Sequence, residues 1–156
     1  MNRFEVAHLV DLIRKSFSVS PIPQVKIIMR SSGEEPAEIQ ALIGGLSWPN
    51  VDSELLLKYE ESGDVSAMPA FLSEVGFRYY LPAFLTYVAS KPKVSGLLLD
   101  HLLHCAADEY SNCEIIRFNG QERRAVLAFL EHQLAQIDLD EFRRRDVNVA
   151  IAAWSK

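Results

Sequence analysis

Apolar residues recur every three or four positions along most of the chain, which is the pattern of α-helices with one buried side. The clearest stripe lies near the N-terminus and consists of Val6, Leu9, Val10, Ile13 and Phe17. Similar stripes predict further helices that begin near Asp52, Ser95, Asn119 and Asp140. A shorter helix is expected between Pro36 and Gly44, because proline suits a first helical turn and glycine suits a helix end.

The most distinctive segment runs from Ser73 to Ser90. Its apolar stripe consists of Phe77, Tyr80, Leu81, Phe84, Leu85 and Val88, and its other side is also largely apolar. Such a helix is typical of the centre of a domain. Pro82 lies inside it and removes one backbone hydrogen bond, so the segment is predicted to kink there, or to divide into two helices.

Two short segments have no helical pattern. Residues 24–30 and residues 113–118 could each be extended, and they could pair as one two-stranded β pair. With 156 residues the chain is long enough for one domain with its own core. The predicted fold is therefore mainly α: a compact single domain of six or seven helices around Phe77–Val88, with this β pair as an optional addition.

Charge, apolar run length and cysteine content indicate which partners and which cellular location to expect. The formal net charge is −5, which opposes binding to phosphate backbones and predicts no nucleic-acid partner. Glu5 and Asp11 interrupt the apolar N-terminus, so no signal peptide is expected. The longest uncharged run, 79–90, is too short to span a bilayer, which predicts no membrane partner. Two cysteines, Cys105 and Cys113, are interpreted as free thiols, and a cytoplasmic location is predicted.

Four features follow one another along the chain: GEEPAEIQALIGGLSW, then FRYYLPAFL, then a leucine-rich helix, then QERRAVLAFLEH. The run Tyr79–Leu85 stands out, because an internal proline beside paired tyrosines is unusual in a helix. In these features the chain resembles a bacterial family of small proteins catalogued as a domain of unknown function, over roughly Gly33 to Leu134. The resemblance implies a shared architecture, and it brings no assigned catalytic residue or cofactor with it.

The predicted leucine-rich helix carries the one pattern that suggests a metal. His101, His104 and Asp108 lie on one stripe with Leu97, and two imidazoles with a carboxylate can bind a transition metal. The histidines are three residues apart, however, and the His-Glu-x-x-His pattern of zinc proteases is missing. A solvated helix face explains the stripe better, so no metal or other cofactor is predicted. Cys105 falls on the leucine side and is interpreted as a small core residue.

Tyrosines provide the best indication of a binding surface. On a helical wheel Tyr80 faces the core, whereas Tyr79 and Tyr87 share a second face two turns apart. Exposed aromatic side chains at this spacing can mark a protein contact, but a helix that covers this side explains them better, because core packing accounts for most aromatic stripes. Pro82 frees the carbonyl group of Arg78, which could line a pocket, and Trp48 lies in a turn as a packing anchor.

The candidate residues for binding a partner or ligand are therefore Trp48, Arg78, Tyr79 and Tyr87. The leading hypothesis is a protein-interaction module, such as an adaptor, a regulator or an immunity-type binder, whose partner is another protein. The alternative is a small-molecule-binding protein or enzyme with a pocket near Pro82. No Gly-rich phosphate loop and no Gly-x-Ser-x-Gly nucleophile motif occurs, and no catalytic residue is assigned, so the sequence favours a protein that is not an enzyme.

Overall fold

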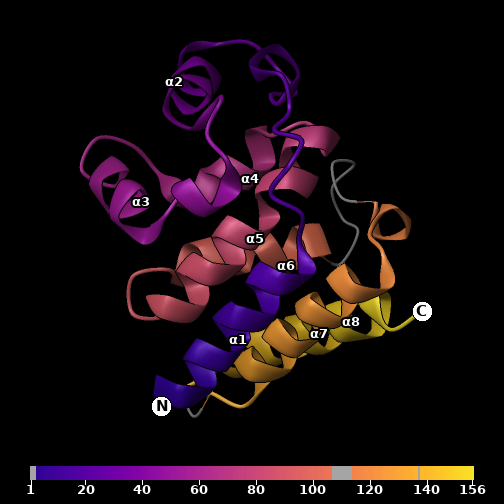
Figure 1. Cartoon of the computed structure of the whole chain (residues 1–156). Coiled ribbons are helices and arrows are strands. Elements are labelled where there is room, and N and C mark those ends of the chain that lie inside the picture. Colours follow the sequence, from indigo (N-terminus) through magenta and orange to yellow (C-terminus); the bar gives the residue numbers. More distant parts are fainter. Residues whose placement is uncertain (1–2, 107–113, 137) are drawn as a thin grey trace.

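The computed structural model describes residues 3–106, 114–136 and 138–156, and in these ranges the fold is helical (Figure 1). The described residues form eight α-helices: α1 (Arg3–Ser16), α2 (Glu34–Ile43), α3 (Ser53–Tyr59), α4 (Met68–Phe71), α5 (Glu74–Ser90), α6 (Gly96–Ala106), α7 (Gly120–Leu134) and α8 (Glu141–Trp154). The prediction of a mainly α fold is confirmed. The predicted six or seven helices are too few, because α4 has only four residues and no periodicity can reveal so short a helix.

The predicted β pair is wrong for the residues that the structure describes. Val25–Ile27 and Ile115–Arg117 are short 3-10 helices, as are Trp48–Asn50 and Val65–Ala67. Met29 instead forms an isolated antiparallel bridge with Leu72. The pairing stops there because helix α5 starts just beyond Leu72 and turns the backbone away from an extended path.

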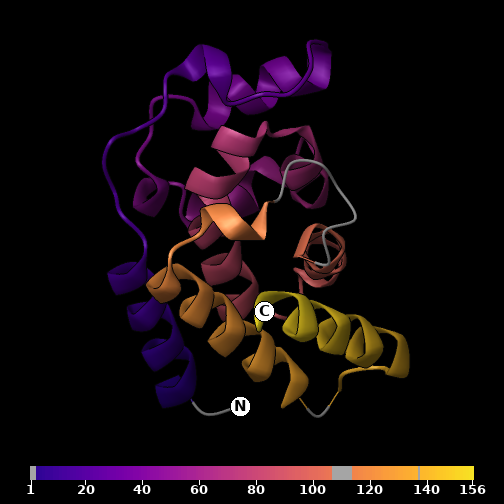
Figure 2. The same cartoon turned by 90° about the vertical axis from the view of Figure 1, so that its right-hand side faces the viewer.

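Helix α5 lies at the centre of the molecule in both views (Figures 1 and 2). Helices α1, α7 and α8 lie together at the bottom of each view, and α2 lies at the top with the 3-10 helix Val25–Ile27. Helix α1 packs against α5 and α7, while α8 packs against α6 and α7. None of the described helices is both long and apolar enough to cross a membrane.

The predicted core stripe of α5 is confirmed. Its side chains are among the most buried in the protein: Phe77, Tyr80, Leu81, Phe84, Leu85 and Val88 are at most 3% exposed. Ser73 is the N-cap and accepts a hydrogen bond from the Gly76 N–H at 3.1 Å. Pro82 lies inside a single continuous helix, so the alternative of two helices is wrong. The Thr86 hydroxyl donates to the Pro82 carbonyl oxygen at 2.8 Å.

Side-chain caps mark the first turns of the two C-terminal helices. The Asn119 side chain accepts from the Glu122 N–H, and the Glu122 carboxylate accepts from the Asn119 N–H, both at 2.9 Å. This reciprocal capping box starts α7. Asp140 caps α8 by accepting from the Arg143 N–H at 2.8 Å. Trp154 of α8 is only 2% exposed, so the C-terminal helix is docked against the rest of the fold.

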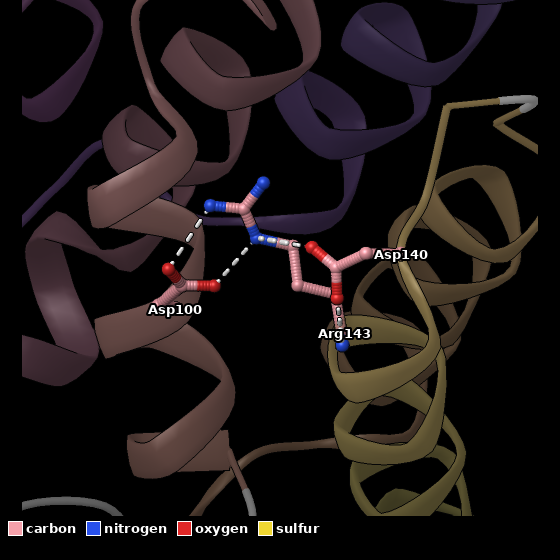
Figure 3. Close-up of polar contacts among 3 residues, drawn as sticks. All are labelled: Asp100, Asp140 and Arg143. Atoms are coloured by element: carbon pink, nitrogen blue, oxygen red, sulfur yellow. Dashed lines mark hydrogen bonds and ion pairs between the residues drawn. The ribbon is translucent and has the colours of Figure 1, made fainter.

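Arg143 joins α8 to α6 by a two-pronged ion pair (Figure 3). Its Nε and Nη2 atoms donate to the two carboxylate oxygens of Asp100 in α6, at 2.8 and 3.0 Å. Asp140 lies on the other side of the guanidinium, with its carboxylate 3.9 Å from Nε. Side chains of Asp100 and Arg143 are each about one third exposed. Because the fork of donors matches the carboxylate, this contact fixes the relative position of the two helices.

Candidate functional site

Tyr79 and Trp48 hold the chain segment that follows α1 against α5. The Tyr79 hydroxyl donates to the Val19 carbonyl oxygen at 2.6 Å and accepts from the Trp48 backbone N–H at 3.3 Å. The indole N–H of Trp48 donates to the Ser18 carbonyl oxygen at 3.1 Å. Burial raises the pKa of Tyr79, so its hydroxyl stays protonated and able to donate. These contacts position residues 18–19 relative to α5.

A groove of about 440 Å³ opens next to these contacts. One wall is the segment after α1, and the other walls come from the first turns of α5, from Arg117 and from the start of α7. We call it the Arg78 groove and define it by its lining. The apolar part of the lining consists of Phe17, Pro21, Pro23, Ile27, Val75 and Tyr79. The charged part consists of Glu74, Arg78, Arg117 and Glu122, and Ser18, Ser20 and Asn119 complete it.

Arg78 and Glu122 form a loose ion pair in this groove. The Arg78 Nη2 atom lies 3.7 Å from a carboxylate oxygen of Glu122. The Arg78 side chain is 46% exposed, whereas that of Glu122 is 10% exposed. The guanidinium also lies 5.8 Å from the centroid of the Phe118 ring, within the range of a cation–π interaction. The pair therefore presents mainly its cation to the groove.

Arg117 is held more tightly by acidic neighbours. Its Nε atom lies 2.5 Å from Glu74 and 2.8 Å from Glu114. The hydrogen bond to Glu114 is the main reason that the pKa of Arg117 is raised. With two carboxylates against one guanidinium, Arg117 has less residual charge to offer than Arg78.

Aliphatic side chains stand exposed in the groove. Ile27 is 44% exposed and Val75 is 47% exposed, and both belong to the lining. Ile116, next to Arg117 in the chain, is 84% exposed. Exposed aliphatic side chains beside an open groove are typical of contact surfaces. The described lining contains no histidine, cysteine or lysine, and each of its two carboxylates, Glu74 and Glu122, lies against an arginine.

A second groove, of about 310 Å³, lies beside the middle of α5 and includes Trp48, Ala83 and Thr86. It is the place where the sequence predicted a pocket near Pro82. Two of its polar side chains serve the fold, because Asp52 accepts from the Leu55 N–H at 2.9 Å as the cap of α3 and the Thr86 hydroxyl donates to the Pro82 carbonyl oxygen. This groove is therefore a weaker candidate for ligand recognition than the Arg78 groove.

Of the four predicted binding residues, two line the Arg78 groove and two do not. Arg78 and Tyr79 line it, while Trp48 is 3% exposed and supports its wall as a packing anchor. Tyr87 is 1% exposed, so it does not share an open face with Tyr79, and the favoured interpretation of a covered side holds at this position. Helix α3 packs against α5, and the Tyr87 ring is covered from solvent as part of the core.

The stripe of His101, His104 and Asp108, interpreted from the sequence as a solvated helix face rather than a metal site, is only partly within the described residues. His101 and His104 are partly buried on α6, and Asp108 lies outside the described residues. The described residues hold no group of three or more His, Cys, Asp or Glu side chains placed to bind a metal ion. Cys105 is buried as expected, and burial raises the pKa of its thiol to about 12. That thiol is a poor nucleophile at neutral pH.

Sequence reasoning missed most of the groove wall. Pro21, Pro23 and Ile27 have no periodic pattern, so nothing indicated that they would lie opposite α5. Glu122 belongs to a capping box, but a capping motif says nothing about an ion pair with a residue of another helix. The sequence signal that could have indicated this wall is the pair of prolines, Pro21 and Pro23, in a segment that has aliphatic residues but no helical pattern.

A family model described as a family of unknown function (DUF6714) matches residues 37–156. No curated protein and no solved structure matches the chain. The matched region supplies all four charged residues of the Arg78 groove, whereas Phe17, Pro21, Pro23 and Ile27 precede it. The groove is therefore assembled from the family region and from the segment before it.

Proposed function

Because the chain belongs to a family of unknown function (DUF6714), and membership assigns no activity, we propose a function from the geometry: a protein-interaction module. Its binding site is the Arg78 groove, and its ligand is a short segment of another protein. The single observation that supports this proposal is the groove lining, which combines exposed Ile27 and Val75 with charged side chains. Interfaces commonly have this anatomy of an apolar centre with a polar rim.

The form of the groove favours a peptide segment over a small molecule. Ligand pockets for small molecules usually enclose most of the ligand surface. Here Arg78, Arg117, Ile27 and Val75 are each more than 40% exposed, so a ligand would remain partly open to solvent. A segment of another protein can extend beyond the groove and gain contacts there.

Selection of short random peptides displayed on phage, with the purified chain as bait, tests the proposal. We expect an enriched set of peptides that bind the wild-type chain and lose binding to Val75→Asp. Val75 lies in the first turn of α5, where an added carboxylate suits the helix dipole, so the variant should fold. Val149→Asp is the matched control, because Val149 is a 49% exposed helical valine outside the groove lining.

Circular dichroism confirms that both variants are folded before binding is compared. The proposal is rejected if no peptide is enriched. It is equally rejected if Val75→Asp binds the enriched peptides as well as Val149→Asp does.

A further inference from the structure

The charges of the Arg78 groove are arranged unevenly. The Glu122 carboxylate is already used by the fold, because it accepts a hydrogen bond from the Asn119 N–H and its side chain is only 10% exposed. Arg78 lies at the open side of the pair with 46% of its side chain exposed. What the pair offers to an incoming ligand is therefore the guanidinium.

Arg78 also has hydrogen-bonding capacity left for a ligand. A guanidinium has five N–H donors, and the 3.7 Å distance to Glu122 is too long for a hydrogen bond. Arg117 differs in charge, because the carboxylates of Glu74 and Glu114 both lie within hydrogen-bond distance of its Nε atom and offset its positive charge. The Phe118 ring, 5.8 Å from the guanidinium carbon of Arg78, stabilises the cation without using a donor.

Apolar side chains line the same groove as the Arg78 guanidinium. Val75 lies three residues before Arg78 on α5, so the two side chains share a face of the helix. Ile27 lines the same groove from the opposite segment. A ligand that satisfies the groove thus needs an acidic group and an apolar group next to each other.

From this arrangement we infer that the groove recognises an aspartate or glutamate side chain adjacent to an aliphatic or aromatic residue of the partner protein. This inference rests on the proposed function and names the chemistry of its ligand. A C-terminal carboxylate would offer similar charge, but such groups are commonly captured by nests of backbone N–H groups. Arg78 supplies a side-chain fork instead, which matches a carboxylate on an internal residue.

The test uses the peptides selected on the wild-type chain, synthesised with amidated C-termini. Each peptide is also made with its acidic residue changed to the amide, Asp→Asn or Glu→Gln. Calorimetry should show that this change weakens binding to the wild-type chain about tenfold, as expected for loss of a charge-assisted hydrogen bond. The same change should have little effect on binding to Arg78→Gln, because the two groups act on each other.

Arg145→Gln is the control for the loss of an arginine. Arg145 has a similar environment, with its guanidinium 5.8 Å from the Phe142 ring centroid and 3.5 Å from Asp146, but it is outside the groove lining. The Arg145→Gln variant should bind the acidic peptide more tightly than its amide version by the same factor as the wild-type chain does. Raising the salt concentration should reduce that preference in the wild-type chain.

The possible results distinguish a failure of the ligand inference from a failure of the proposed function. Enriched peptides without acidic residues, or an acid-to-amide effect of equal size in wild type and Arg78→Gln, overturn the inference and leave the proposed function standing. Loss of binding on amidation of the C-terminus alone also overturns it, because a terminal carboxylate would then be the ligand. If no peptide is enriched at all, both the function and the inference are rejected.

Discussion

At the residue scale, buried tyrosine hydroxyls differ in what they contribute. The Tyr80 hydroxyl lies 2.9 Å from the carbonyl oxygens of both Ile43 and Leu46, and it joins the end of α2 to α5. Burial raises its pKa to about 12, so it remains a donor at any physiological pH. The Tyr87 hydroxyl is equally buried and has no hydrogen-bond partner among the described residues. Two tyrosines on one helix thus have opposite hydrogen-bonding states.

This contrast gives a paired prediction. Tyr80→Phe should lower the free energy of unfolding by about 1–3 kcal/mol, because the buried hydroxyl that donates toward the Ile43 and Leu46 carbonyl oxygens is lost. Tyr87→Phe should be neutral or slightly stabilising, since it removes a buried hydroxyl that has no described partner. Urea unfolding of both variants measures the difference. Equal losses for the two variants would contradict the hydrogen-bond assignment.

At the element scale, α5 is positioned by a close approach to residues 27–30. The Ser73 hydroxyl donates to the Ile27 carbonyl oxygen at 2.6 Å, and the Ser73 N–H donates to the Ile28 carbonyl oxygen at 2.8 Å. Gly76 lies against the same Ile28 carbonyl, and a Cβ atom there would overlap with the carbonyl oxygen. Because Ile27 belongs to the Arg78 groove, this approach also sets one groove wall.

Gly76→Ala should therefore destabilise the protein by about 1–3 kcal/mol, since the backbone of Ile28 cannot move aside without breaking its bonds to Ser73. Gly120→Ala is the matched control. It is also a helical glycine, but the nearest atom to its added Cβ would be the flexible end of Arg124 at 3.8 Å. Thermal unfolding should rank Gly76→Ala well below wild type and Gly120→Ala at or above it.

The ion pair between α6 and α8 allows a second prediction at this scale. A double-mutant cycle with Asp100→Asn and Arg143→Gln should give a coupling free energy of about 1 kcal/mol, reduced by salt, because both side chains are partly exposed. The cycle for Arg145 and Asp146 should give a value near zero. Those two residues are adjacent in sequence, and their contact joins no separate elements. A coupling no larger than that of the control would mean that the pair in Figure 3 does not hold α6 to α8.

At the scale of the whole molecule, α1 completes a core that the rest of the chain leaves open. It lies before the family region and packs against α5 and α7 through Leu9 and Ile13, which are 6% and 0% exposed. His132 of α7 is partly buried, and Glu5 of α1 is the charged residue that acts on it. Burial lowers the pKa of His132, while Glu5 opposes this shift.

The stability of the folded chain should therefore depend on pH through His132. Its pKa is lower in the folded chain than the ordinary value of 6.5, so the unfolded chain binds more protons in the window between them. The stability that comes from keeping His132 neutral is fully present above pH 6.5, its ordinary pKa. This stability is lost as the pH falls through the lower pKa that His132 has in the folded chain. Urea unfolding between about pH 8 and about pH 5 should show this loss in wild type and less of it in His132→Gln. An identical pH dependence in both would contradict it.

Much of the helical architecture could be predicted because helices carry local signals. The apolar stripe of 77–88, the caps at Ser73 and Asp140 and the Asn119–Glu122 box each lie within a few residues of the structure they specify. Tyr87 shows the limit of such signals. A helical wheel gives the direction of a side chain, but it cannot tell whether other parts of the fold cover that direction, as they do for Tyr87, which is 1% exposed.

The sequence by itself determined where helices begin and which side of each is apolar, since backbone hydrogen bonds and side-chain periodicity are set by neighbours in the chain. The tertiary structure alone decided the Arg78 groove. Its walls come from positions as far apart as Phe17 and Glu122, and its charge depends on an ion pair between α5 and α7. Such contacts arise only when packing brings distant segments together, and no local pattern encodes them.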